Sequence, residues 1–201
     1  MYKSFGTSME KEEKEKKGEA EANELSSKFL KTRQIILSGE INKELAEKIA
    51  RQLLILEADS SDPIRLFIDS PGGDADAGFA IFDMIRFINA PVYTIGMGLV
   101  ASAASIVLLA APAERRLALP NSRYLIHQPL SGIRGVATEI EIHAKELEKM
   151  RVKINELIAQ ETGKNVDLVK TDTERDFWLD SAEAKEYGLV SKIVTKRAEI
   201  A

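Results

Sequence analysis

Ser102 stands at a point in the sequence where a serine could act as a nucleophile. It follows the small-residue stretch 96–101 (GMGLVA), where a predicted strand gives way to a predicted helix. A serine there lies among helix amides that have no partner within the helix, near the positive end of the helix dipole. This position suits a nucleophile whose attack creates an oxyanion. A helix-capping serine, or small residues that allow tight helix packing, would give the same pattern.

Two histidines are the only candidates for a general base of imidazole type. His127 directly follows the apolar strand predicted over 124–126, which places it at the carboxyl end of a strand. His143 lies inside a long charged helical segment, so we expect it on the surface. His127 is therefore the candidate base, with a purely structural histidine as the alternative. An acidic third member could be any of three aspartates: Asp172, Asp176 and Asp180.

The turn over 69–74 (DSPGGD) is a candidate anion-binding element. It follows a predicted strand directly and contains the adjacent glycines Gly72 and Gly73. Glycines adopt backbone angles that other residues avoid, and such turns leave N–H groups free to point at an anion. In parallel α/β layers, ligands bind beyond the carboxyl ends of the strands, and this turn lies at such an end. The spacing by itself favours a plain turn between strand and helix.

The composition excludes several classes of function. The chain has 201 residues, with 28 basic and 32 acidic side chains and a net charge of −4, which argues against nucleic acid as the main partner. It has no cysteine, so thiolate zinc sites, iron–sulfur clusters and a cysteine nucleophile are excluded. With two histidines it cannot build a multi-histidine metal site. We expect no metal, no cofactor and no nucleotide-binding motif.

The patterns along the chain indicate a soluble α/β protein. Strands are predicted over 33–38, 64–68, 92–95, 124–126 and 193–194, and helices over 43–58, 75–88, 102–111, 137–161 and 181–187. Alternation of this kind implies parallel strands covered by helices. The uncharged segment 91–112 is long enough for a membrane span. Its glycines and serines and its lack of flanking aromatic residues instead favour a buried strand, turn and helix.

The ends of the chain differ in character from its middle. Residues 1–24 are rich in glutamate and lysine and have no apolar face, so we expect a flexible charged tail. Residues 25–195 are predicted to form a single domain, followed by a C-terminal tail over 196–201. The N-terminus has no apolar stretch of signal-peptide type, so cytoplasmic residence is expected.

Four segments resemble the Clp protease proteolytic subunit, a self-compartmentalising serine peptidase. They read FIDSPGGDADAGFAIFDMIRFI, TIGMGLVASAASIVLLAA, LPNSRYLIHQPLSG and TDTERDFWLDSAEAKEYGLVSKI. The similarity covers about residues 28–195 in order and without large gaps. It implies a crotonase-like α/β fold and serine endopeptidase activity on unfolded polypeptides.

The resemblance also implies a role for each site residue. Ser102 matches the family's nucleophile, His127 its base, and Asp176 the aspartate that orients the histidine. The oxyanion hole of the family is formed by main-chain N–H groups that match those of Gly73 and Ala103. Together these residues imply acyl transfer by a Ser–His–Asp triad.

The assembly implied by the resemblance is a pair of stacked seven-membered rings that enclose the active sites. The helix 137–161 resembles the family's interlocking handle (132–161 as a whole), preceded by a glycine-containing strand over Gly132–Gly135. Arg175 matches an arginine that pairs with a carboxylate across the ring-to-ring contact, and Glu139 is the expected partner. A hexameric ATPase of the Clp/Hsp100 type would feed in unfolded polypeptide, with no role for nucleic acid or membrane.

This sequence departs from the family pattern in two places. Leu99, Val100, Ala103 and Ala104 replace the residues that usually flank the family's nucleophile, and such changes could narrow the cleft or alter cleavage preference. In the ATPase-docking pocket, the family often has an aromatic residue where this chain has an arginine, although other positions keep an apolar lining. The four positions of this pocket are Arg65, Phe67, Phe87 and Leu117.

Two alternatives to an active peptidase stay open at this point. A crotonase-type acyl-CoA enzyme shares the fold and an oxyanion hole of two backbone amides, but it has no use for a Ser–His–Asp set. A catalytically weak or regulatory subunit in a mixed ring would normally lose a triad residue, and none is lost here.

Overall fold

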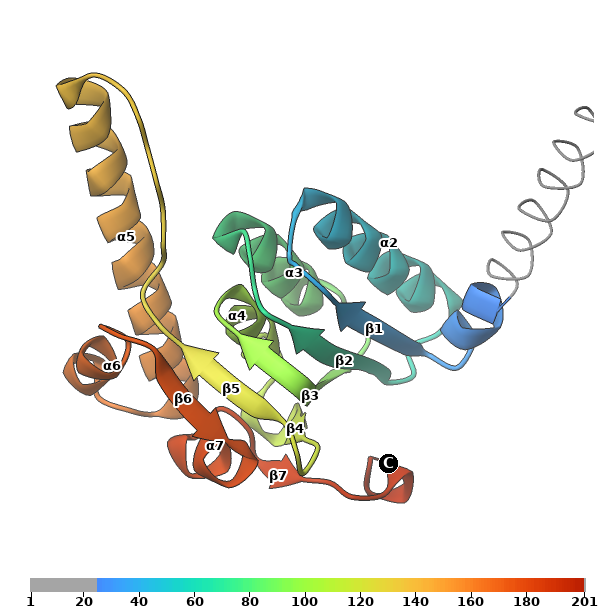
Figure 1. The fold of residues 1–201 in the computed structure, drawn as a ribbon. Coiled ribbons are helices and arrows are strands. Elements are labelled where there is room, and N and C mark those ends of the chain that lie inside the picture. Colours follow the sequence, from blue (N-terminus) through green and yellow to red (C-terminus); the bar gives the residue numbers. More distant parts are fainter. Residues whose placement is uncertain (1–24, 201) are drawn as a thin grey trace, which may run out of the picture.

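A mostly parallel sheet forms the centre of the computed structural model, which describes residues 25–200 (Figure 1). Its main path runs β1-β2-β3-β4-β7, with every neighbouring pair parallel. The strands are β1 (Gln34–Ser38), β2 (Ile64–Ser70), β3 (Val92–Ala101), β4 (Arg116–Ala118) and β7 (Lys192–Ile193). The charged tail expected over 1–24 lies outside the described residues. The predicted α/β class with parallel strands is confirmed.

Strand β3 is longer than predicted and pairs with different strands along its length. Its first part pairs with β4 over Thr94–Gly96, and its last part pairs with β5 (Arg123–Ile126) over Leu99–Ala101. Gly98 between the two parts has φ +58°. The Asp69 carboxylate accepts a hydrogen bond from the Leu99 amide at 3.0 Å, which stabilises this irregularity. The strand therefore continues past residue 95 as far as Ala101, and Ser102 directly follows its end.

The β5 strand also carries the antiparallel partner β6 (Phe177–Asp180). In this pair Ile126 lies opposite Phe177. The last residue of β5 therefore lies beside the first residue of β6. Sequence alternation had predicted parallel strands only, and β6 was not predicted at all.

Three helices cover one face of the sheet (Figure 1). They are α2 (Lys43–Asp59), α3 (Ala75–Phe87) and α4 (Ala103–Leu108). In α2 the buried positions recur at helical spacing, as Ile49, Leu53 and Leu56 show, and the Asn42 side chain caps the first turn by accepting from the Leu45 amide. Burial of each such Leu or Ile side chain stabilises the fold by about 1.5–3 kcal/mol.

The uncharged segment 91–112 lies inside the domain, as expected. It forms β3 and then α4. All residues of α4 are buried, as are most of those of β3. Within residues 25–200, none of the helices combines the length and the apolar character that crossing a membrane requires.

The last residues that the structure describes fold back onto the other face of the sheet. Residues Arg197–Glu199 form a short 3-10 helix, and Ile200 is buried against Ile95, Leu117 and Val194. The Arg65 guanidinium donates to the Ile200 carbonyl oxygen at 3.0 Å. The segment expected as a C-terminal tail is thus packed as far as Ile200.

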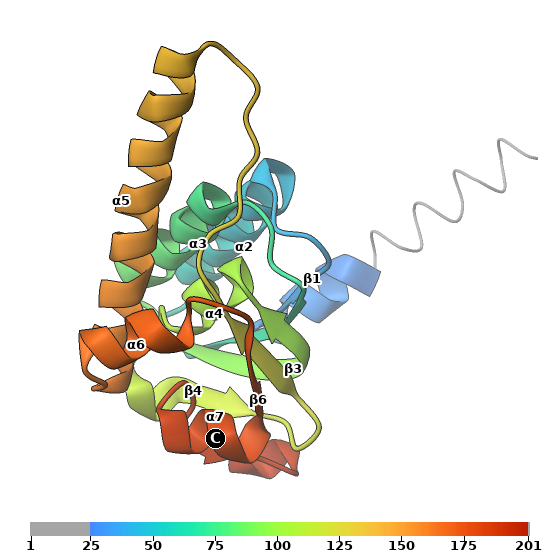
Figure 2. The ribbon, with the colours of Figure 1, turned by 60° about the vertical axis from the view of Figure 1, so that its left-hand side comes forward.

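Helix α5 (Ala137–Thr162) projects from the body of the domain, and the loop over 127–136 runs beside it (Figures 1 and 2). Its buried residues, from Ile154 to Ala159, all lie in its second half, next to α6 (Val166–Asp172). The strand expected over Gly132–Gly135 is wrong, because no residue of the 127–136 loop is in a strand. An extended segment becomes a strand only when a neighbour satisfies its backbone groups, and residues 25–200 supply none there.

Candidate active site

Ser102 lies at the tight turn between β3 and α4. Its φ of +54°, combined with a ψ of −123°, is a backbone conformation that a non-glycine residue rarely adopts. The Ser102 amide donates to the Leu125 carbonyl oxygen at 2.9 Å, which holds the turn against the end of β5. The Ser102 side chain caps no amide of α4, so the capping alternative does not apply. Backbone strain of this kind is typical of residues that a fold positions for chemistry.

His127 follows β5 and meets Asp176, which precedes β6. The His127 Nδ1 and Asp176 Oδ1 atoms lie 3.1 Å apart. The antiparallel pair Ile126–Phe177 explains this contact, because the next residue of β5 and the preceding residue of β6 must face each other. The structure thus brings together the expected base and the expected aspartate.

Two other aspartates are occupied elsewhere. Asp172 accepts a hydrogen bond from the Tyr187 hydroxyl at 2.8 Å. Burial, together with this carboxylate, raises the pKa of Tyr187 above its usual range. Asp180 caps α7 (Ser181–Tyr187) by accepting from the Ala182 and Glu183 amides. Of the three aspartates that the sequence left open, Asp176 is the one that contacts the histidine.

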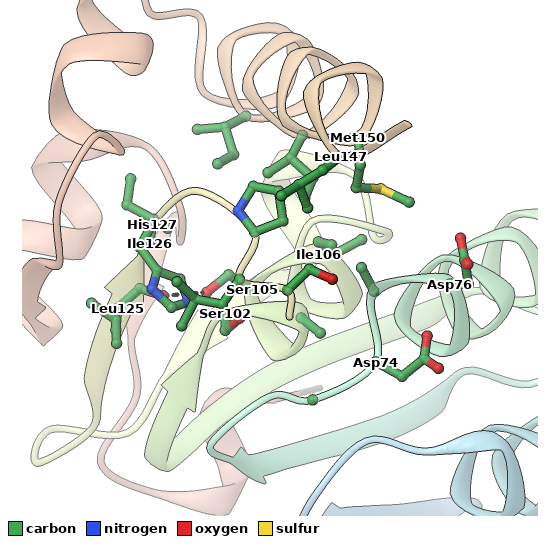
Figure 3. A pocket seen from close by; sticks show the side chains of 18 of the residues that line it. Asp74, Asp76, Ser102, Ser105, Ile106, Leu125, Ile126, His127, Leu147 and Met150 are labelled. Carbon is green, nitrogen blue, oxygen red and sulfur yellow. Dashed lines mark hydrogen bonds between the residues drawn. The ribbon is translucent and has the colours of Figure 1, made fainter. Parts of the chain in front are cut away.

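Ser102 and His127 lie on the same wall of a cavity of about 700 Å³ (Figure 3). The residues described show no hydrogen bond from the Ser102 hydroxyl to the imidazole. Contacts between nucleophile and base are often longer before a substrate binds. His127 is therefore in contact with Asp176 on one side and lines the same cavity as Ser102 on the other.

The turn with two glycines packs directly on the Ser102 turn. Gly72 and Gly73 have φ of +92° and +143°, as expected of positions that require glycine. A Cβ atom on Gly72 would lie 2.9 Å from the Ala103 nitrogen, so the two turns are in close contact. Ala103 is the first residue of α4, and its N–H group has no partner within that helix. Gly73 and Ala103 both line the cavity.

Helix α5 closes the far side of the cavity, which the sequence did not reveal. His143, Leu147, Met150, Ile154 and Ile158 all line it. His143, expected on the surface, is half-buried and contacts the Ser131 hydroxyl through Nε2 at 2.6 Å. The spacing of these five residues is that of one helix face, which is the signal that could have placed His143 there.

The residues around Ser102 that depart from the family pattern are mostly buried. Val100 and Ala104 are fully buried, so they fill the core rather than the cleft. Ser105 is also buried, and its hydroxyl donates to the Leu125 carbonyl oxygen at 3.2 Å, the oxygen that also accepts from the Ser102 amide. Ser105 thus helps hold the Ser102 turn to β5, a role that sequence reasoning missed.

Arg175 and Glu139 are both exposed. Arg175 directly precedes Asp176, and Glu139 lies in the first turn of α5. No ion pair joins them within residues 25–200 of a single chain. Across the same residues, no group of three or more His, Asp or Glu side chains is arranged to hold a metal ion.

Comparison with known proteins identifies the family. The sequence profile of the Clp protease family matches residues 16–197. The chain is 73% identical over 177 residues to the ATP-dependent Clp protease proteolytic subunit 2 of Treponema denticola, covering 88% of each chain. It is 63% identical to the subunit of the same name from Treponema pallidum, covering 92% of this chain and 95% of that one.

A solved structure gives the same result. A mutant of ClpP1 from Listeria monocytogenes matches with a TM-score of 0.83 and 48% identity, covering 88% of this chain and 99% of that one. These matches span almost the whole length of each relative. The chain belongs to the Clp protease family.

Proposed function

We propose that this chain is a serine endopeptidase subunit of a cytoplasmic Clp protease that hydrolyses unfolded polypeptides to short peptides. The observation that carries the proposal is that His127, which contacts Asp176, lines the same cavity as Ser102. A Ser–His–Asp set is of no use to a crotonase-type acyl-CoA enzyme. Residues 25–195 would form the catalytic domain.

The proposed chemistry is acyl transfer through Ser102. His127 Nε2 takes the proton of the Ser102 hydroxyl as its oxygen attacks the peptide carbonyl carbon, and it then gives that proton to the leaving amine. Asp176 accepts from His127 Nδ1, which fixes the tautomer that leaves Nε2 free to act as a base. Water repeats the sequence on the acyl-enzyme and releases the second product.

The N–H groups of Gly73 and Ala103 are proposed to stabilise the oxyanion. The support is that both residues line the cavity and that the Gly72 position lies against the Ala103 nitrogen. Donors of this kind are already oriented where negative charge develops, and loss of one typically costs about 100- to 1,000-fold in turnover.

The working particle is proposed to be two stacked seven-membered rings served by a hexameric Clp/Hsp100 ATPase. Helix α5 projects from the domain, and the loop beside it exposes large apolar side chains such as Leu130 and Val136. Exposed apolar surface of this kind favours a protein partner. Arg175 and Glu139, both exposed, are the proposed ion pair between rings. Both Treponema relatives are named ATP-dependent Clp protease proteolytic subunit 2.

Hydrolysis of a short fluorogenic peptide tests the proposal. The wild-type chain should cleave the peptide, and Ser102→Ala should lose this activity while assembling as the wild type does. The matched control is Ser131→Ala, which changes a serine of the same cavity that contacts His143 instead. Equal turnover by wild type and Ser102→Ala would overturn the nucleophile assignment.

A further inference from the structure

The Asp176 side chain has little to hold it in place. It is 63% exposed, and its contact with His127 is the hydrogen bond that the structure shows for it. An exposed carboxylate with one partner is free to rotate into water, and ordering it costs conformational entropy. Its position must therefore come from the backbone on either side. The β5–β6 pairing fixes the side that follows Asp176.

Gln128 fixes the side that precedes Asp176. Its backbone N–H donates to the Thr173 carbonyl oxygen at 2.7 Å. Its side-chain Nε2 donates to the Glu174 carbonyl oxygen, also at 2.7 Å. The residue after the proposed base thus binds the two carbonyl groups that come just before Arg175 and Asp176.

Thr173 is in turn held from helix α5. Thr173 and Asn155 are 1% and 2% exposed, and the Thr173 hydroxyl lies 2.8 Å from the Asn155 amide oxygen. The same hydroxyl lies 2.8 Å from the Val169 carbonyl oxygen. A hydroxyl has one proton, so both contacts can be hydrogen bonds when Asn155 turns its NH₂ group toward Thr173. Each of the two buried side chains then has a hydrogen-bond partner in the other.

The position of Asn155 in α5 indicates that the Asn155–Thr173 pair has a positioning role. Its neighbours on the buried face of the helix are Ile154, Ile158 and Ala159. An apolar side chain there would avoid the cost of burying an amide and has a better helix propensity than asparagine. A buried polar pair of this kind specifies one geometry rather than adding stability.

We propose that Asn155, Thr173 and Gln128 form a positioning clamp, which sets the backbone before Asp176 so that its carboxylate meets His127. The clamp joins three elements: α5 through Asn155, the end of α6 through Thr173, and the end of β5 through Gln128. None of the three residues is a catalytic residue, because none lines the cavity or contacts the reacting atoms. The inference rests on the proposed peptidase function.

Removal of the Thr173 hydroxyl tests the clamp. Thr173→Val keeps the shape of the side chain and should lower kcat about 10- to 100-fold, because a misplacement of about 1 Å in a catalytic set costs up to about 100-fold. KM should stay within about twofold of the wild type, since the cavity is untouched. Thr173→Ser keeps the hydroxyl and should restore kcat to within about threefold of the wild type.

Thr171→Val is the matched control. Thr171 lies two residues earlier, at an exposed position of α6, and its hydroxyl donates to the Asp167 carbonyl oxygen at 3.0 Å rather than to a residue of α5. This variant should keep wild-type kcat. The rate of inactivation by a fluorophosphonate should fall in Thr173→Val and not in Thr171→Val, because it reports nucleophile activation without peptide binding.

Gln128→Met keeps the test decisive if Thr173→Val fails to fold. It removes only the donor to the Glu174 carbonyl oxygen and should lower kcat with KM preserved. Wild-type kcat in a folded Thr173→Val or Gln128→Met chain would overturn the clamp, as would a Thr173→Ser chain as slow as Thr173→Val. A wild-type chain without Ser102-dependent hydrolysis would instead refute the peptidase function, and the clamp with it.

Discussion

His127 and Asp176 are 49 positions apart in the chain and 3.1 Å apart in the structure. What joins them is strand register: Ile126 pairs with Phe177, and the two residues just beyond this pair must face each other. The contact therefore depends on a few backbone hydrogen bonds between β5 and β6. Changes in that short ladder should reach the proposed chemistry without touching the cavity.

Asp176→Asn should lower kcat about 10⁴-fold, because an amide facing Nδ1 favours the wrong imidazole tautomer. Steady-state hydrolysis of a short peptide measures this loss. Asp180→Asn is the matched control, since Asp180 caps α7 and asparagine caps helices as well as aspartate does. Equal losses in the two variants would show that Asp176 has no special role.

His127→Ala should be as damaging as Ser102→Ala, because members of a triad act as a unit. His143→Ala removes an imidazole from the same cavity, but one that contacts Ser131. We expect its kcat to stay within about tenfold of the wild type, a range taken from a single lost neutral hydrogen bond of about 1 kcal/mol. The same peptide assay compares both variants. A loss on removal of His143 as large as that of His127 would contradict the assignment of the base.

Arg175→Ala should yield mostly single rings with little peptidase activity. The variant leaves Glu139 unpaired at the proposed contact and removes the interaction that would hold Arg175, next to Asp176, against the opposite ring. Sedimentation velocity and a peptide assay on the same sample measure both effects. Arg51→Ala, which changes an exposed arginine paired with Glu47 on its own helix, is the control and should leave assembly and activity unchanged. Intact double rings with full activity in Arg175→Ala would refute the coupling.

Gly96→Ala should destabilise the domain by roughly 1–3 kcal/mol, the usual cost of overpacking a core. A Cβ atom at Gly96 would lie 2.3 Å from the hydroxyl oxygen of Tyr124, which is fully buried and cannot yield. Urea unfolding measures the change. Gly132→Ala is the control, because a Cβ atom there meets nothing within 4 Å. Equal stability of the Gly96→Ala chain and the wild type would show that the sheet adjusts freely at this point.

Alkaline pH should destabilise the wild type partly through Tyr124. Burial raises the pKa of Tyr124 to about 12, from an ordinary value of 10.0. Between these values the unfolded chain ionises this phenol and the folded chain does not, so stability is retained below pH 10 and lost as pH rises toward 12. Between pH 10 and 12 the free energy of unfolding should fall by about 2–3 kcal/mol less in Tyr124→Phe than in the wild type, because a pKa difference of two units corresponds to this energy. Parallel unfolding curves of the two chains against pH would contradict this.

The helices and strands that have a regular local spacing of apolar residues could be predicted from the sequence. The helices predicted over 43–58 and 75–88 and the strand predicted over 64–68 match α2, α3 and β2 to within about two residues at each end. The strands β4 and β6, of three and four residues, were not predicted, whereas β5, which is as short as β6, was predicted from its apolar residues. The strand expected over Gly132–Gly135 was wrong because pairing depends on a neighbour and not on local composition.

The candidate site also has residues that could be predicted from local position and residues that depend on long-range pairing. Ser102 and His127 could be chosen from their positions after strands, but Asp176 could not be separated from Asp172 and Asp180 by spacing. That choice depends on the register of β5 with β6, which is a long-range property. His143 was placed on the surface because its sequence neighbours are charged. Its helix face, shared with Leu147 and Met150, turns it toward the cavity instead.

Labelling with a fluorophosphonate, followed by mass spectrometry of the digested chain, tests most directly whether Ser102 is an activated nucleophile. We expect one modified residue, Ser102, and strongly slowed labelling in His127→Ala. The nearby Ser105, buried and bonded to the Leu125 carbonyl oxygen, should stay unmodified. An unmodified chain, or one modified at a different serine, would contradict the proposal that Ser102, His127 and Asp176 form a working triad.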